Sequence, residues 1–321
     1  TCDRFKVDVE NTAGRLTMTQ TADGPNGISA NCIKLDCTTA DASIAAGEAL
    51  VLSHRLEGQN IQRIGKGVAG AKQVTLSFYV KASAGFTFAA ELFDVDYSRQ
   101  CTKLFDTTTD WVRHELTFPA DVDDGSSPFD DNNALSLIIN FWLHAGSTYT
   151  GGTLNTAAFV NQTAANRAAG IDSFFSNTAN NFFITGVQME VGPVATEFEQ
   201  EDIGVTLAKC QRYYYKTGPI ATNGCFGTGF NVSTTVGVGE TVFPVKLRAI
   251  PTALEQNGTA AHYRIAHRAT ATNCSAVPAL DRVNTDRAIT TFTVGSGLTA
   301  GDGIEIRSQN STAFLAWSAE L

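Results

Sequence analysis

The sequence lacks an apolar run long enough to cross a membrane as a helix, which needs about 18 residues or more. Its longest apolar stretch, residues 134–145 (ALSLIINFWLHA), is interrupted by Ser136, Asn140 and His144. The start of the chain also lacks the basic and then apolar pattern of a secretory signal peptide. We therefore expect neither membrane insertion nor a signal sequence.

Positive charge is scarce and dispersed. Lys and Arg total 23 against 32 Asp and Glu, which gives a net charge of −9 and a pI of about 5.0. Because contacts to nucleic-acid phosphates rely on clustered Lys and Arg, we expect no nucleic-acid partner.

Motifs of catalysis and metal binding are also missing. The five histidines form no HxH, HExxH or zinc-type cluster, and no GxSxG or SxxK motif is present. The seven cysteines are odd in number and form no CxxC pair, which favours buried free thiols over a disulfide framework. We expect no enzyme, although two carboxylates for glycoside hydrolysis lie close in space rather than in sequence and so remain an alternative.

What the sequence does contain is β-structure. Apolar and polar residues alternate at strand spacing, and one segment, residues 135–143, is apolar on both faces, as in a central strand that is covered on both sides. Clusters of Gly, Asn, Asp and Ser separate the strands, which is typical of a β-sandwich or jelly roll. The expected strands of the first half are 74–81, 86–92, 111–118, 135–143 and 183–191.

The second half has the same character without repeating the sequence. We expect strands at 241–247, 262–265, 289–294, 303–306 and 314–317. The predicted fold is mainly β, with three parts: an N-terminal jelly-roll β-sandwich (1–200), a linker helix with an aromatic exit (201–217) and a smaller C-terminal β-sandwich domain (218–321).

One convincing helix lies between the two halves. Apolar residues recur at i, i+4, i+7 and i+11, acidic residues precede the helix, and basic residues follow, as the helix dipole favours. Three consecutive tyrosines fit an extended exit. We predict that these residues pack between domains or between copies of the chain: Ile203, Leu207, Cys210, Tyr213, Tyr214 and Tyr215.

Aromatic residues offer a candidate saccharide contact. Trp142 and Tyr149, with Trp111, supply the flat apolar faces that stack on sugar rings. Core packing at strand positions is the alternative for both tryptophans, whereas Tyr149 lies in a turn-like segment.

An acidic loop offers the hard oxygen ligands that calcium prefers. Its spacing is not that of an EF-hand. A solvated turn is the simpler interpretation, a structural calcium ion is the alternative, and no other cofactor is expected. The residues are Asp121, Asp123, Asp124, Asp130 and Asp131.

An ordered set of segments resembles virion structural proteins of tailed bacteriophages, especially marine ones, that are described as tail-fibre or tail-associated proteins. The set covers most of residues 1–215 and two points beyond them. The segments are 3–5 (DRF), 54–60 (HRLEGQN), 74–81 (VTLSFYVK), 141–147 (FWLHAGS), 186–192 (GVQMEVG), 195–199 (ATEFE), 210–214 (CQRYY), 243–252 (FPVKLRAIPT) and 319–321 (AEL). Glu197 departs from the family pattern, which has proline at this position.

The resemblance implies a jelly roll similar to carbohydrate-binding modules, followed by a smaller β-domain, with no catalytic residues. It implies a virion protein, assembled in the bacterial host cytoplasm, whose partners are other copies of the chain (a homotrimer), other virion proteins and a host-surface glycan. The expected function is an appendage subunit, in a tail or head fibre, that displays β-domains for host attachment. The alternatives are a capsid or tail decoration protein with a mechanical role, and a carbohydrate-binding or polysaccharide-acting protein.

Overall fold

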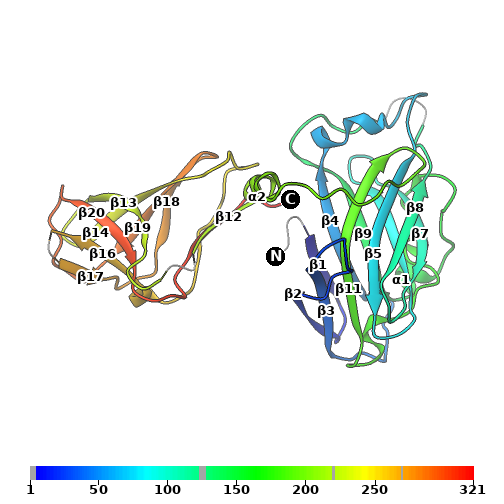
Figure 1. The fold of residues 1–321 in the computed structure, drawn as a ribbon, viewed down its shortest axis with the longest axis horizontal. Helices are drawn as coiled ribbons and strands as arrows, with labels where there is room; N and C mark the ends of the chain where they lie inside the picture. The colour runs from blue at the N-terminus through cyan, green and yellow to red at the C-terminus, as the bar shows by residue number, and fades with distance from the viewer. Residues whose placement is uncertain (1–4, 123–127, 219–220, 269) are drawn as a thin grey trace. The chain divides into compact units, whose positions relative to one another are not determined.

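The computed structural model describes residues 5–122, 128–218, 221–268 and 270–321. The chain divides into two compact units, residues 1–200 with Leu321, and residues 201–320. The predicted linker helix and aromatic exit belong to the second unit. The mainly β architecture expected from the sequence is confirmed, since antiparallel sheets make up both units (Figure 1).

The first unit is a jelly-roll sandwich of two antiparallel sheets. The six-stranded sheet has the order β1-β4-β9-β6-β7-β10, and the five-stranded sheet has the order β2-β3-β11-β5-β8. The strands are β1 (Phe5–Glu10), β2 (Arg15–Thr21), β3 (Cys32–Thr39), β4 (Ala49–Glu57), β5 (Val74–Ala82), β6 (Thr87–Asp94), β7 (Arg99–Asp106), β8 (Val112–Phe118), β9 (Leu135–Ala145), β10 (Val160–Asn161) and β11 (Asn181–Val191). The short helices are η1 (Gly58–Asn60), η2 (Gln62–Ile64), α1 (Ser147–Thr150), η3 (Ala164–Asn166) and η4 (Phe174–Ser176).

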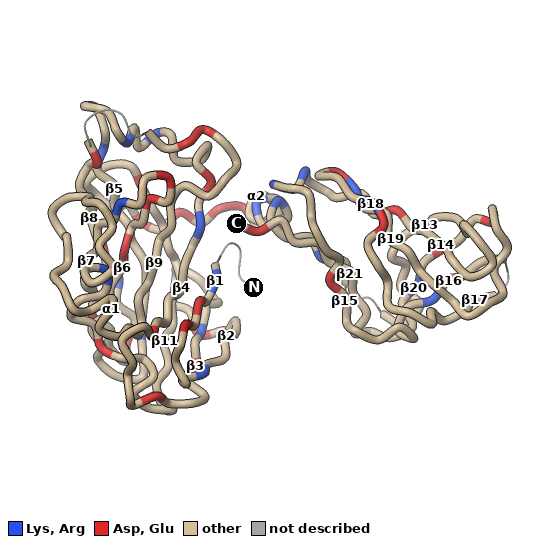
Figure 2. The backbone as a smooth tube through the Cα atoms, turned by 180° about the vertical axis from the view of Figure 1, so that it is seen from behind, with Lys and Arg blue, Asp and Glu red and all other residues tan. Residues whose placement is uncertain are grey.

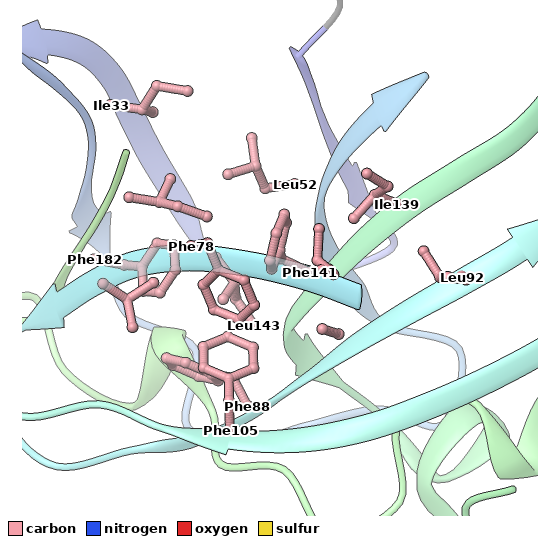
Figure 3. Close-up of a cluster of buried hydrophobic side chains, with 14 of the residues drawn as sticks. Ile33, Leu52, Phe78, Phe88, Leu92, Phe105, Ile139, Phe141, Leu143 and Phe182 are labelled. Atoms are coloured by element: carbon pink, nitrogen blue, oxygen red, sulfur yellow. The ribbon is translucent and has the colours of Figure 1, made fainter. Parts of the chain in front are cut away.

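Phenylalanine dominates the core between these sheets. Phe78 and Phe141 meet edge to face with ring centroids 5.1 Å apart, and Phe78 meets Phe105 in the same way. Figure 3 shows these rings with Phe88 and Phe182 in one cluster. Because successive side chains of a strand point to opposite faces, the same alternation that fills this core sets which residues line the outer faces.

The last strand of the sandwich contains a β-bulge that the sequence analysis missed. The register of β11 on β5 shifts between Thr185 and Gln188, and Gly186 has a φ of +59°, in the left-handed region. Val187 and Met189 pack on the core. Phe183 and Thr185 therefore lie on the opposite face of the strand. The predicted regular alternation over 183–191 is wrong because an extra residue reverses the side-chain order.

The second unit contains a seven-stranded sheet, with the order β17-β16-β20-β13-β14-β19-β18, and a three-stranded sheet, with the order β12-β21-β15. One core, which includes Phe292 and Trp317, lies between them. The elements are α2 (Ile203–Gln211), β12 (Tyr214–Thr217), β13 (Cys225–Asn231), β14 (Val236–Val242), β15 (Glu255–Gln256), η5 (Ala260–His262), β16 (Tyr263–His267), β17 (Thr270–Asn273), β18 (Ala279–Val283), β19 (Arg287–Thr293), β20 (Gly303–Ser308) and β21 (Leu315–Ser318).

Two predictions in this unit are wrong at their boundaries. The predicted strand over 241–247 ends at Val242, two residues before Pro244, which has no N–H for a sheet ladder. The predicted helical stripe includes Tyr214, but α2 ends at Gln211 and Tyr214 pairs with Ser318 as part of a strand. The start of the helix has a physical cause, because the Asp202 carboxylate caps it by accepting from Gly204 N at 2.8 Å.

Candidate functional site

The outer face of the six-stranded sheet carries a buried polar cluster built around Glu91. In β9, the side chains of Phe141 and Leu143 enter the core, so Trp142 lies on the opposite face. Residues 146–172, which we call the strap, include β10 at the edge of this sheet, and Tyr149, Ala168 and Ile171 of the strap pack with Trp142 on the outer face. The prediction that residues 135–143 form a strand covered on both sides is confirmed.

Glu91 of β6 is the centre of the cluster and is 0% exposed. Its Oε2 accepts hydrogen bonds from Asn140 Nδ2 and Trp142 Nε1, both at 2.9 Å. Arg167 of the strap donates from Nε to Oε1 and from Nη2 to Oε2, both at 2.8 Å. A buried carboxylate is stable only when it is paired and hydrogen-bonded in this way.

Aromatic rings enclose the same guanidinium. The Arg167 Cζ lies 4.6 Å from the ring centroid of Phe93 and 4.9 Å from that of Trp142. On the strap, Tyr149 lies 5.1 Å from Trp142 between ring centroids. Burial raises the pKa of Tyr149, and the nearby Glu10 carboxylate adds to the effect.

The structure brings together two of the three predicted platform residues. Trp142 and Tyr149 are neighbours, but Trp142 is only 3% exposed, so Tyr149, which is half-buried, is the more accessible of the two. Trp111 precedes β8 in the other sheet and packs against Phe183, 6.4 Å away between ring centroids. The three rings therefore form no single platform.

The predicted calcium loop is divided in the same way. Both oxygens of Asp121 accept hydrogen bonds from Arg99, at 2.9 and 2.7 Å. Asp130 and Asp131 are exposed, and Asp123 and Asp124 lie outside the described residues. Within the described ranges, no group of three or more His, Cys, Asp or Glu side chains is placed to hold a metal ion.

The predicted packing residues of the second unit separate into two groups. Tyr213 is buried, Tyr214 donates a hydrogen bond to Glu255 Oε2 at 2.9 Å, and Tyr215 stacks on Trp317. Burial, followed by the Glu255 hydrogen bond, raises the pKa of Tyr214 to about 12. The tyrosines thus contribute to the fold of their own unit.

The helix residues of that group remain on the surface. Ile203 is 79% exposed and Leu207 is 52% exposed, whereas Cys210 is half-buried. None of the nine residues of α2 is buried.

A second buried network was missed because its members are far apart in sequence. The buried imidazole of His144 has Nδ1 2.7 Å from Ser173 Oγ and Nε2 3.1 Å from Glu48 Oε2. Desolvation lowers the pKa of His144, against the opposing effect of Glu48. A hydroxyl, an imidazole and a carboxylate in a row are components of nucleophilic catalysis. Because the ring is 0% exposed, we interpret this set as a structural network.

The six described cysteines are free thiols, of which four are buried as predicted, whereas Cys210 is half-buried and Cys225 is exposed. Figure 2 shows Lys and Arg interspersed with Asp and Glu along both units. Among the described residues, no helix is both long and apolar enough to span a membrane.

Comparisons with known proteins give only distant matches. No family model matches the chain, and no curated protein matches it. Solved structures that match include one described as "CBM4 structure and function" (11% identity, 59% of this chain, 87% of that chain, TM-score 0.33). The family 11 carbohydrate-binding module from Clostridium thermocellum, in complex with a β-1,3-1,4-mixed-linked tetrasaccharide, matches with 10% identity, over 60% of this chain and 91% of that chain, with a TM-score of 0.30.

The enzymatically active domain of bacteriophage CBA120 tailspike protein 4 also matches, with 12% identity over 60% of this chain and a TM-score of 0.34. The match spans 20% of that tailspike chain. Likenesses at these identities and TM-scores carry no inference about function.

Proposed function

We propose that the chain is a non-enzymatic structural subunit of a tailed-bacteriophage appendage, which assembles with copies of itself and displays two β-domains for attachment to the host surface. The ordered resemblance to virion proteins supports a place in the virion, after assembly in the host cytoplasm alongside other virion proteins. Whether the appendage belongs to the tail or to the head is a question for electron cryomicroscopy of the particle.

The observation that carries the proposal is the exposed apolar surface of α2. Ile203 and Leu207 are four residues apart, so they share one face of the helix, and Val205 is also 47% exposed. Each unit has a complete core of its own, and neither core includes Ile203, Val205 or Leu207. Apolar side chains that stay exposed beside complete cores mark a surface for another molecule.

A second and third copy of the same chain fit this surface best. Leu207 and Cys210 follow Ile203 at spacings of four and seven residues, which is the seam of a short coiled coil. Fibre subunits commonly associate through symmetric burial of such faces. Lys209, in the last turn of α2, pairs with Glu201 just before the helix, and neither residue belongs to the apolar seam.

Light scattering of the full chain at tens of micromolar tests the proposal. We expect the mass of a trimer, and we expect the double substitution Ile203→Asp/Leu207→Asp to give monomers with an unchanged melting temperature. Val242→Asp, at another exposed apolar position of the second unit, is the matched control and should keep the trimer. A monomeric wild-type chain at this concentration would refute self-assembly.

A second candidate function is saccharide binding by the first unit. The half-exposed ring of Tyr149 beside Trp142 supplies one accessible aromatic face. Binding to a microarray of bacterial surface glycans, lost in Tyr149→Ala and retained in Tyr149→Phe, would support it. Release of reducing ends from any of those glycans would contradict the non-enzymatic assignment.

A further inference from the structure

The cluster around Glu91 has the composition of a binding site for a planar cation. A carboxylate provides two acceptor oxygens in one plane, and the rings of Phe93 and Trp142 provide apolar faces near it. Asn140 and the Trp142 indole hold the carboxylate in place through Oε2. A carboxylate beside aromatic faces is the chemistry that recognises cations in proteins.

Arg167 fills this site from within the chain. Its two hydrogen bonds to Glu91 are both 2.8 Å long and use both carboxylate oxygens, which a forked guanidinium satisfies and a lysine ammonium does not. The side chain of Arg167 is 14% exposed and that of Glu91 is 0% exposed, so the pair is almost fully withdrawn from water. Removal of the guanidinium would leave a buried carboxylate without its countercharge.

Because Arg167 belongs to the strap and Glu91 to β6, their contact holds the strap to the sheet. Backbone hydrogen bonds tie the strap to itself on both sides of Arg167, from Gly152 N to Ala165 O at 2.8 Å and from Ala168 N to Tyr149 O at 2.9 Å. The residue next to Arg167, Ala168, and the ring of Tyr149 pack on Trp142. Main-chain contacts hold earlier parts of the strap to β7, through the pairing of β10 and from Thr102 N to Asn155 O at 3.0 Å. Arg167 is the side chain that fastens the part of the strap beside Trp142 to β6.

We propose that Glu91, Phe93, Asn140 and Trp142 form a guanidinium-binding cage, and that Arg167 occupies it as a latch that keeps the strap closed over Trp142. The cage would accept a free guanidinium ion once the Arg167 side chain is removed. Any saccharide that contacts Trp142 must first displace this latch. The proposal does not depend on self-assembly through α2, because every residue of the cage lies in the first unit.

Fluorescence quenching can follow the latch through Trp142. The chain has three tryptophans, and Trp142 and Trp317 are 3% and 0% exposed. In a Trp111→Phe background, quenching by acrylamide should therefore be weak. Adding Arg167→Ala should raise the quenching constant severalfold. Low-millimolar guanidinium chloride should then restore the weak quenching, whereas sodium chloride at the same ionic strength should not.

A matched control comes from the other sheet. Arg113 lies over the ring of Tyr79 and pairs with Glu115, so Arg113→Ala removes a similar side chain that does not touch the cage. It should leave the quenching of Trp142 unchanged with or without guanidinium. Arg167→Lys should give intermediate quenching, because the charge is kept and the forked contact is lost.

Two results would overturn the proposal: unchanged quenching in Arg167→Ala, or a guanidinium effect no larger than that of sodium. If Arg167→Ala does not fold, recovery of its circular dichroism by the same low-millimolar guanidinium chloride is the equivalent test, since guanidinium otherwise favours unfolding. Failure of that recovery would also overturn it. Light scattering on the same samples separates these outcomes from any loss of assembly.

Discussion

Removing the ring of Phe141 should weaken the first unit and leave the second unit unchanged. Phe141 is 0% exposed and sits in the middle of the core, with ring centroids 5.1 Å from Phe78 and 6.1 Å from Phe105. A buried Phe→Ala substitution costs about 3–5 kcal/mol. Each edge-to-face pair adds about 0.5–1.5 kcal/mol beyond area burial. We therefore expect Phe141→Ala to lower the unfolding free energy of this unit by about 4 kcal/mol or more.

Urea denaturation followed by unit-specific fluorescence measures this effect. A Trp317→Phe variant leaves emission only from the first unit, and Trp111→Phe/Trp142→Phe leaves it only from the second. Phe141→Ala should shift the urea midpoint of the first signal alone. Phe292→Ala, at a 1% exposed position of the other core, should shift only the second. Midpoints that move together in both variants, or a loss below about 1 kcal/mol for Phe141→Ala, would refute the reasoning from separate cores.

Three further predictions concern protons, thiols and backbone contacts. Burial holds the folded-state pKa of His144 below its ordinary value of 6.5, so the unfolded chain binds more protons than the folded chain as the pH falls through that value. The urea midpoint of the first unit should therefore fall on acidification. His144→Gln should flatten this pH dependence. Burial raises the pKa of Cys274 to about 12. Iodoacetamide at neutral pH should therefore label the exposed Cys225 and leave Cys274 unmodified until the second unit unfolds. Mass spectrometry of the peptides would show this, and early labelling of Cys274 would contradict its burial. A Cβ at Gly229 would lie 1.8 Å from the Val238 backbone oxygen. Gly229→Ala should therefore lower the unfolding free energy of the second unit by about 1–3 kcal/mol, measured as a fall in its melting temperature. An unchanged melting temperature would exclude so close an approach of the two strands.

Periodicity identified the strands with long uninterrupted patterns. Residues 74–81 and 135–143 were predicted as strands and lie in β5 and β9, because the first alternates apolar and polar residues without a break and the second has apolar residues on both faces. The reversal at Gly186 was missed, since a bulge adds one residue without changing composition. A single glycine within an alternating pattern was its only signal.

The candidate site shows the same division. Trp142 and Tyr149 were recognised as aromatic candidates, but no sequence pattern connects them with Glu91 and Arg167, which lie 76 residues apart. Their pairing depends on the path of the strap across the sheet. The acidic loop was misleading for the same reason, because Arg99 reaches Asp121 only in the folded sandwich.

By itself, the sequence determined the mainly β architecture and the position of the helix between the two halves. These features follow from local periodicity, which each segment carries within itself. The tertiary structure alone decided that Trp142 is enclosed, that Trp111 lies on the other sheet, and that Arg167 is the partner of Glu91. Such contacts join segments through sheet register and loop path, and local sequence does not encode either one in isolation.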